Sequence, residues 1–174
     1  VADMMCGFGG VFGCADLAKA IGLYHDIGKY SKEFQNRILN DGPKVDHSTA
    51  GGQILYHRDD NKLLATMAAY CIMSHHTGLI NGGSKSDVAD MRSLHARLQR
   101  EVKDYSAYAA EIDPSPLKPP ALMFKNSDPS FSLAFLIRML FSSLVDADFL
   151  DTEAFMSGGK VQRGPYDNIE NLRD

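Results

Sequence analysis

The adjacent pair His25-Asp26 carries the strongest chemical signal in this chain. An imidazole nitrogen binds cations such as Mn, Fe, Co, Ni or Zn, and a carboxylate can hold one cation or bridge two. More histidines follow beside apolar segments, at His47 and at the pair His75-His76. A single histidine is more often a surface group or a hydrogen-bonded interior group. Taken together, however, these residues favour metal-assisted hydrolysis.

Lys29 follows the His-Asp pair closely enough to place an ammonium group beside a metal-bound phosphate. There it would offset the negative charge that develops on a phosphoryl group during transfer. A solvated lysine near the C-terminus of a helix, favoured by the helix dipole, is an equally good interpretation. The other two histidines, His57 and His95, lie among charged residues and are expected to be solvated.

A further acidic candidate lies in the apolar run from residue 140 to residue 153, which contains Asp146 and Asp148. A buried carboxylate without a partner is costly, so an acid in this run needs a cation or a hydrogen-bond donor. Residues two apart on a helix point about 200 degrees apart, so the two acids are not expected to bind the same cluster. One of them is expected to complete the metal site.

The elements that position these residues are expected to be helices, because apolar residues recur at helical spacing and no segment resembles a strand. The predicted fold class is all-α, an irregular helical bundle. Gly28 and Gly78 follow the two ligand pairs and are expected to end their helices at a shared pocket. Residues 78–86 are predicted to form a loop and residues 113–120 an extended linker. Helices are predicted at 1–11, 14–28, 31–40, 47–57, 61–76, 88–111 and 129–151.

Size and charge limit the possible classes of function. The 174 residues fit one domain with its own core, predicted at 1–157, with 158–174 as a domain exit or linker. The net charge of -4 is opposite to that of a protein that grips DNA unaided, so a nucleic-acid substrate would need local attraction or delivery by a partner. No apolar run could span a bilayer and no secretory segment is seen, so no membrane partner and a cytoplasmic location are expected. The three cysteines are expected to be reduced apolar fillers.

Four segments resemble the HD nuclease domain of the CRISPR-associated helicase-nuclease of type I systems, a branch of the HD superfamily. The resemblance runs from residue 14 to residue 153, in the family's motif order. A short His-Asp signal alone is weak, but the other three segments are specific. The segments are Leu-Tyr-His-Asp-Ile-Gly-Lys-Tyr-Ser-Lys-Glu-Phe-Gln (23–35), Asp-His-Ser-Thr-Ala-Gly (46–51), Ser-His-His-Thr-Gly (74–78) and Leu-Val-Asp-Ala-Asp-Phe-Leu-Asp-Thr-Glu (144–153).

The resemblance implies an HD-type bundle with a dinuclear centre in which Asp26 bridges two divalent transition-metal cations, Mn, Ni, Co or Fe, with Mg also acceptable. His25 and Asp148 would bind one of the cations. Asp148 is preferred to Asp146 because an Ala-Asp step followed by an aromatic residue resembles the last acidic ligand of the family. The other cation would be bound by His47, His75 and His76.

The same resemblance implies a hydrolase, a two-metal-ion nuclease that cuts single-stranded DNA during CRISPR antiviral interference. Asp26 and Lys29 would be its catalytic residues. A helicase domain or subunit would feed the strand, and an RNA-guided surveillance complex would recruit the enzyme. No phosphate-cradling Gly-x-x-x-x-Gly-Lys-Ser/Thr loop occurs in this chain, so any helicase is a separate unit or is fused beyond residues 158–174.

The HD superfamily carries a further histidine on its first helix, and no histidine precedes His25 here. Because residues 1–4 look like the middle of an amphipathic helix, the chain is expected to begin after that ligand. Loss of the ligand is the alternative. In either case the first cation is expected to bind weakly, because a missing ligand removes both affinity and geometry.

Two other functions remain open from the sequence. An HD phosphohydrolase acting on nucleotides or cyclic nucleotides would use the same ligands, and competition between mononucleotides and oligonucleotides would separate it from a nuclease. A non-catalytic helical module would hold a structural cation or none. It would be favoured if metal removal unfolded the protein without any loss of hydrolysis.

Overall fold

The structure is a computed structural model that describes residues 1–112, 117–120 and 128–160. Within these residues it is all-helical, as expected, and its only β-type pairing is an isolated bridge between Asn81 and Ser93. The α-helices are α1 (Ala2–Val11), α2 (Ala15–Tyr24), α3 (Lys32–Asn40), α4 (Ser48–Arg58), α5 (Lys62–Ser74), α6 (Leu94–Gln99) and α7 (Pro129–Met156). The 3₁₀ helices are η1 (Ile27–Tyr30) and η2 (Ser106–Ala110).

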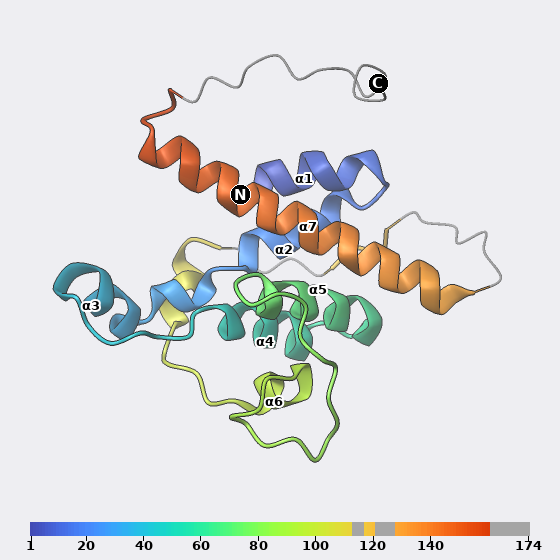
Figure 1. Ribbon diagram of the computed structural model, residues 1–174, viewed down its shortest axis with the longest axis horizontal. Coiled ribbons are helices and arrows are strands. Elements are labelled where there is room, and N and C mark those ends of the chain that lie inside the picture. Colours follow the sequence, from blue (N-terminus) through green and yellow to red (C-terminus); the bar gives the residue numbers. More distant parts are fainter. Residues whose placement is uncertain (113–116, 121–127, 161–174) are drawn as a thin grey trace, which may run out of the picture.

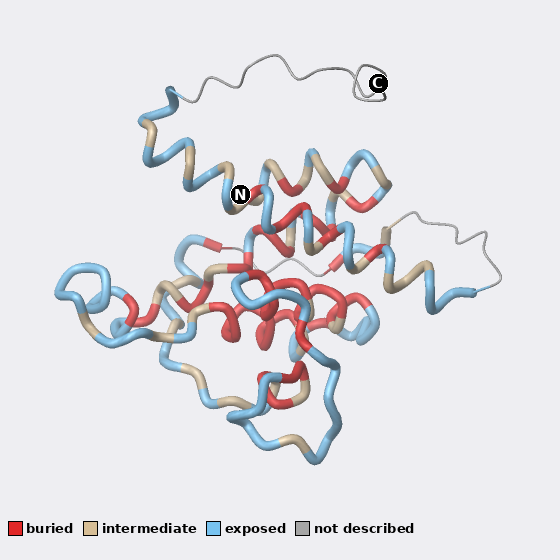
Figure 2. Tube along the Cα trace, viewed as in Figure 1, coloured by how far each residue is buried: buried red, intermediate tan, exposed pale blue. Residues whose placement is uncertain are grey.

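The long helix α7 crosses one side of the bundle, where it packs against α1, α2 and α5 (Figure 1). Helices α4 and α5 pair with each other below it, and α6 packs on that pair at the side away from α7. Buried residues concentrate in α2, α4 and α5, at the centre of the molecule (Figure 2). The core there includes the fully buried side chains of Leu17, Tyr24, Met67 and Leu140. Burial of these apolar groups is the main force that holds the helices together.

Five of the predicted helices are confirmed to within a few residues at each end, namely those at 1–11, 31–40, 47–57, 61–76 and 129–151. Polar side chains cap the starts of three of them, α3, α5 and α7. Ser31 accepts from the Phe34 N–H (3.3 Å) at the start of α3, and Asn61 accepts from the Leu64 N–H (3.2 Å) at the start of α5. Helix α7 runs a further turn beyond the predicted end, to Met156.

The predicted helix at 88–111 is wrong. It is replaced by turns, the short helix α6 and the 3₁₀ helix η2. The backbone leaves the helical conformation at Arg100, with φ -67° and ψ 136°. The side-chain amide of Gln53, on α4, donates to the carbonyl oxygens of Arg97 (2.8 Å) and Arg100 (2.7 Å). Contacts with a distant helix therefore satisfy the carbonyls at the end of α6 and override the local helical pattern.

The loops agree with the sequence where they are described. Residues 78–86 lie outside the helices, as predicted. Of the predicted linker, residues 113–116 lie outside the described residues, and Leu117 is buried with its N–H bonded to Asp59 (2.8 Å). Most of the predicted tail, residues 161–174, also lies outside the described part. All three cysteines are free, with Cys14 and Cys71 buried as expected for apolar fillers. Among the described residues no helix is both long enough and apolar enough to cross a membrane.

Candidate metal centre

The His-Asp pair lies in a break between two helices. Helix α2 ends at Tyr24, and the chain resumes as η1 at Ile27. The helix predicted over 14–28 is thus shorter than expected, and Gly28 lies inside η1 instead of ending α2. His25 still has helical backbone angles, but Asp26 leaves the helical conformation, with φ -112° and ψ 16°. Both side chains can therefore face one cluster, although neighbours on a regular helix would point about 100 degrees apart.

Gly28 has a different role from the one predicted, because it lets η1 approach the start of α4. Its N–H donates to the carbonyl oxygen of His47 (3.2 Å). A side-chain carbon at Gly28 would lie 2.4 Å from that same oxygen, far inside van der Waals contact. A similar close approach occurs one turn further along α4, where a side chain at Gly51 would collide with the carbonyl of Tyr24. These two glycines therefore bring His47 next to the His-Asp pair.

The start of α4 is fixed by Asp46, a residue whose role was missed from the sequence. One carboxylate oxygen of Asp46 accepts from the N–H groups of Ser48 (3.2 Å) and Thr49 (3.2 Å), which lie in the first turn of α4. The other accepts from the Thr49 hydroxyl (2.7 Å) and from Arg100 (3.0 Å). This capping holds the backbone on both sides of His47. The pattern Asp-x-x-Thr immediately before a helical run could have revealed it.

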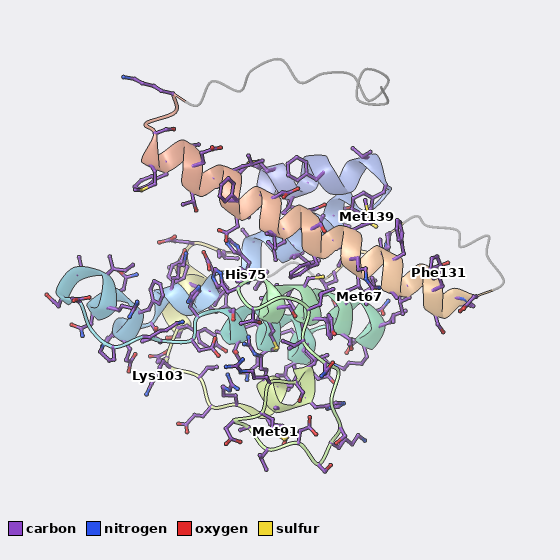
Figure 3. The ribbon with its side chains drawn as sticks, in the orientation of Figure 1. Met67, His75, Met91, Lys103, Phe131 and Met139 are labelled. Atoms are coloured by element: carbon purple, nitrogen blue, oxygen red, sulfur yellow. The ribbon has the colours of Figure 1, made fainter. Side chains whose placement is uncertain are left out.

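The double histidine lies at the end of α5. His75 is the residue that caps the helix, and His76 follows in the turn. Gly78 takes a left-handed conformation, with φ +78°, and turns the chain away, as predicted for a helix end. The break in regular helix again lets two neighbouring side chains reach the same place. Figure 3 labels His75 near the centre of the molecule, below α7.

The structure brings all six predicted ligands together. Their ligand atoms fall into two groups, each within 4.8 Å, that share Asp26. One group is His25, Asp26 and Asp148, and the other is Asp26, His47, His75 and His76. In the first, His25 Nε2 lies 3.1 Å from Asp26 Oδ2 and 3.5 Å from Asp148 Oδ1. In the second, Asp26 Oδ1 lies 3.6 Å from His47 Nε2 and 3.9 Å from His75 Nε2.

The two acids of α7 differ in position. Asp148 is partly buried and faces His25, whereas Asp146 is exposed and belongs to neither group. The helical separation expected between them is observed. The carboxylate of Asp148 is thus the one in reach of the cluster, and it comes from α7, which crosses above α4 and α5 in Figure 1.

The two buried histidines present their Nε2 atoms to the cluster. His25 Nδ1 donates to the carbonyl oxygen of Gly22 (2.8 Å), and His75 Nδ1 donates to that of Ile72 (2.6 Å). Because a carbonyl only accepts, these bonds place the ring proton on Nδ1 and direct Nε2 at the cluster. Metal-binding histidines are commonly oriented by a hydrogen bond of this kind.

Three buried polar atoms of the cluster have no hydrogen-bond partner among the described residues: His25 Nε2, Asp26 Oδ1 and His75 Nε2. Buried polar atoms are nearly always satisfied, so three orphans in one place require an explanation. All three are aimed at the same small space and can offer a lone pair to it. Divalent cations bound there would satisfy each of them, so the residues fit the metals that such a ligand set implies.

Burial opposes ionisation of both members of the His-Asp pair, but their mutual contact and their neighbours outweigh it. The carboxylates of Asp148 and Asp26 raise the pKa of His25 to about 9. Contact with His25 and then with Lys29 holds the pKa of Asp26 well below its usual range. Burial lowers the pKa of His75 to about 4, with help from the neighbouring histidines. At neutral pH and without bound cations, His25 therefore carries a second ring proton, on Nε2, which a cation would have to displace, whereas His75 is neutral and keeps the lone pair of its Nε2.

Lys29 lies against the cluster. Its Nζ is 2.5 Å from Asp26 Oδ2, and its side chain remains 41% exposed. The ammonium group also lies over the ring of Phe34, 5.9 Å from the centroid. Lys29 therefore contacts the shared carboxylate and still faces solvent, a position from which it can meet an incoming anion.

The remaining histidines lie outside the cluster. His57 is exposed, as expected, but His95 is only partly exposed, and its neighbour Arg97 is buried. Arg97 donates to the backbone carbonyl of Met73 and to the hydroxyl of Ser48 (3.1 Å). It thereby ties α6 to the end of α5 and the start of α4. No local pattern around Arg97 indicated this, because its partners lie far away in the sequence.

Comparison with known families gives a match to the HD domain over residues 4–114, more than half of the chain. A search of curated proteins found no match. The matched region contains the five candidate ligands that lie next to the ends of α2, α4 and α5, and the geometry adds Asp148 from α7. With its all-helical fold and its cluster of histidines and aspartates, the chain belongs to the HD domain family, whose members are typically metal-dependent hydrolases.

Proposed function

We propose that this HD domain is a two-metal-ion phosphodiesterase that cleaves single-stranded DNA. One observation carries the proposal, namely that two groups of ligand atoms share the carboxylate of Asp26. A carboxylate shared in this way is suited to bridge two cations, and a pair of cations is the arrangement used to hydrolyse phosphodiesters. A structural site would need only one closed set of ligands.

The residues divide the work as follows. His25, Asp26 and Asp148 would hold one cation, and the second would be held by Asp26, His47, His75 and His76. When bound, the two cations supply an activated water and an electrophilic clamp on the scissile phosphate. The mixed nitrogen and oxygen donors suit Mn, Ni, Co or Fe, with Mg an acceptable substitute.

Lys29 would act at the open side of this centre. Its ammonium group fixes one oxygen of Asp26 and, being partly exposed, can approach a non-bridging oxygen of the phosphate. A positive charge there offsets the negative charge that grows on the phosphoryl group, which makes Lys29 the second catalytic residue of the proposal.

Single-stranded DNA is proposed as substrate because four segments of the chain resemble the nuclease domain of type I CRISPR systems, and those segments supply all six ligands. The chain has a net charge of -4, so strand delivery by a helicase and recruitment by an RNA-guided surveillance complex are part of the proposal. Residues 1–157 would be the nuclease domain, and 158–174 the connection to the helicase if one is fused. Antiviral interference in the cytoplasm is the proposed setting.

The test is cleavage of a labelled single-stranded oligonucleotide with Mn²⁺, Ni²⁺ or Co²⁺ supplied. Asp26→Ala should abolish cleavage, because it removes a ligand from both groups. Asp146→Ala is the matched control, since this acid is exposed and outside the cluster. Intact oligonucleotide with the unaltered protein under all three metals would refute the nuclease. Preferential hydrolysis of mononucleotides or cyclic nucleotides would instead identify a nucleotide phosphohydrolase with the same ligands.

A further inference from the structure

A cleft of about 360 Å³ opens beside the ligand cluster. His47 and His76 belong to the cluster and also line the cleft, so the two are continuous. The other walls come from the segment before α4, the turn after α5, and α6 with the loop that precedes it. Pockets for small ligands occupy roughly 300–1,000 Å³, so this cleft can hold a group of about the size of one nucleotide phosphate with part of its sugar.

The charge of the cleft is opposite to that of the whole chain. Its lining includes four cationic side chains and two acidic ones, whereas the chain has a net charge of -4. A local positive field inside a concave wall attracts anions even when the rest of the surface repels them. The charged lining residues are Lys44, Arg92, Arg97 and Arg100, with Asp46 and Asp90.

Two of the four cationic side chains are bonded to other parts of the protein and hold the wall of the cleft in place. Arg97 is buried and bonded to neighbouring helices. Arg100 donates to Asp46 (3.0 Å), and also to the carbonyl oxygens of Ala89 (2.9 Å) and Met91 (3.3 Å). It thus neutralises one of the two acids and holds the loop before α6 against the start of α4. The backbone next to Arg92 is therefore fixed by contacts that do not involve the Arg92 side chain.

The other two cationic side chains of the cleft are available to bind a ligand. Lys44 and Arg92 are exposed and come from different segments, and neither forms an ion pair within the described part of the chain. The remaining acid of the cleft, Asp90, is exposed and so weakly interacting. Cationic side chains that line the same small cleft and form no ion pair within the described residues are suited to bind a phosphate group.

We infer that Lys44 and Arg92 bind a backbone phosphate of the substrate strand adjacent to the scissile one. This inference rests on the proposed function and adds a specificity subsite to it. The shared residues His47 and His76 place the cleft directly alongside the metal centre, so one strand can occupy both. An isolated phosphodiester, which lacks a neighbouring phosphate, would reach only the metals.

Binding is tested without metal, in the presence of a chelator, using fluorescence anisotropy of a labelled oligothymidylate. The double variant Lys44→Glu/Arg92→Glu should bind about tenfold more weakly, and the slope of log K against log salt concentration should fall by about 0.7 for each strand phosphate that the variant no longer neutralises. The matched control Lys19→Glu/Arg138→Glu makes the same change in net charge at exposed sites outside the cleft.

Equal affinity and equal salt dependence in the two double variants would overturn the inference. So would displacement of the oligonucleotide by thymidine monophosphate at equal phosphate concentration, since the cleft would then bind free phosphate instead of a strand.

Hydrolysis separates failure of the subsite from failure of the function. With Mn²⁺ added, the ratio of oligonucleotide cleavage to hydrolysis of bis(p-nitrophenyl) phosphate should fall about tenfold in the cleft variant, mainly through KM, and should stay constant in the control. An unchanged ratio overturns the subsite. If the unaltered protein hydrolyses neither substrate while binding to the oligonucleotide still depends on Lys44 and Arg92, the proposed function fails and the subsite stands.

Discussion

Replacing Gly28 with alanine should displace His47 from the shared carboxylate. The new methyl carbon would lie 2.4 Å from the carbonyl oxygen and 2.5 Å from the Cα atom of His47. Ordinary contact begins near 3.4 Å, so the His47 backbone must retreat by about 1 Å. Metal ligands keep their distances within about 0.2 Å, so a shift of this size should cost the group of His47, His75 and His76 its cation. Overpacking of this kind also destabilises by about 1–3 kcal/mol.

Both effects can be measured on one preparation. Thermal unfolding in chelator should show a Tm lowered by about 2–4 °C for each kcal/mol lost. Calorimetric titration with Mn²⁺ should show one bound ion fewer than in the unaltered protein. Gly7→Ala is the matched control, because its added carbon meets nothing within 4 Å on the exposed side of α1 and should stabilise the helix by about 0.5–1 kcal/mol. If Gly28→Ala keeps the Tm and the metal stoichiometry of the parent, the close approach of η1 to α4 does not position the site.

Three further outcomes are expected. The folded-state pKa of His25 is raised from 6.5 to about 9, so the stability that its protonation adds is complete below pH 6.5 and is lost as the pH rises through 9. Thermal unfolding in chelator should show this decline in stability. The affinity for Mn²⁺ should rise over the same pH interval, because the competing proton leaves His25. A flat profile from pH 6.5 to 9 would contradict this. Asp148→Asn should weaken the binding of one Mn²⁺ ion in calorimetric titration, whereas the exposed Asp146→Asn should bind Mn²⁺ like the parent. Asp46→Ala should destabilise by about 1–2 kcal/mol in urea unfolding through loss of the α4 cap, and an effect no larger than that of the exposed Asp60→Ala would rule that role out.

The helices were predictable where local pattern and tertiary structure agree. Helix α5 has apolar residues at helical spacing and a capping Asn61, so both sources indicate the same element. The region 88–111 could not be predicted, because its hydrogen bonds go to Gln53 and Asp46, which lie about fifty residues earlier. Propensity carries no information about partners at such a distance.

The site was predictable as a set of residue types and less so as a geometry. Adjacent histidine and aspartate residues indicated a metal centre, and Gly78 indicated where one helix ends. The role of Gly28 was not visible in the sequence, because glycine is found both where two backbones approach closely and where a helix ends in a turn. The cationic cleft was hidden for a similar reason, since Lys44 and Arg92 line one cleft only after α4 and α6 have packed together.

Asp148 is the one ligand that comes from α7, more than seventy residues after His76. During synthesis the histidines leave the ribosome well before this aspartate does, and domains assemble as their segments emerge. The group of His25, Asp26 and Asp148 cannot exist until α7 has been made and has docked across α1, α2 and α5. A nascent chain therefore lacks the complete set of candidate ligands, and the proposed hydrolysis would require that this last helix has docked.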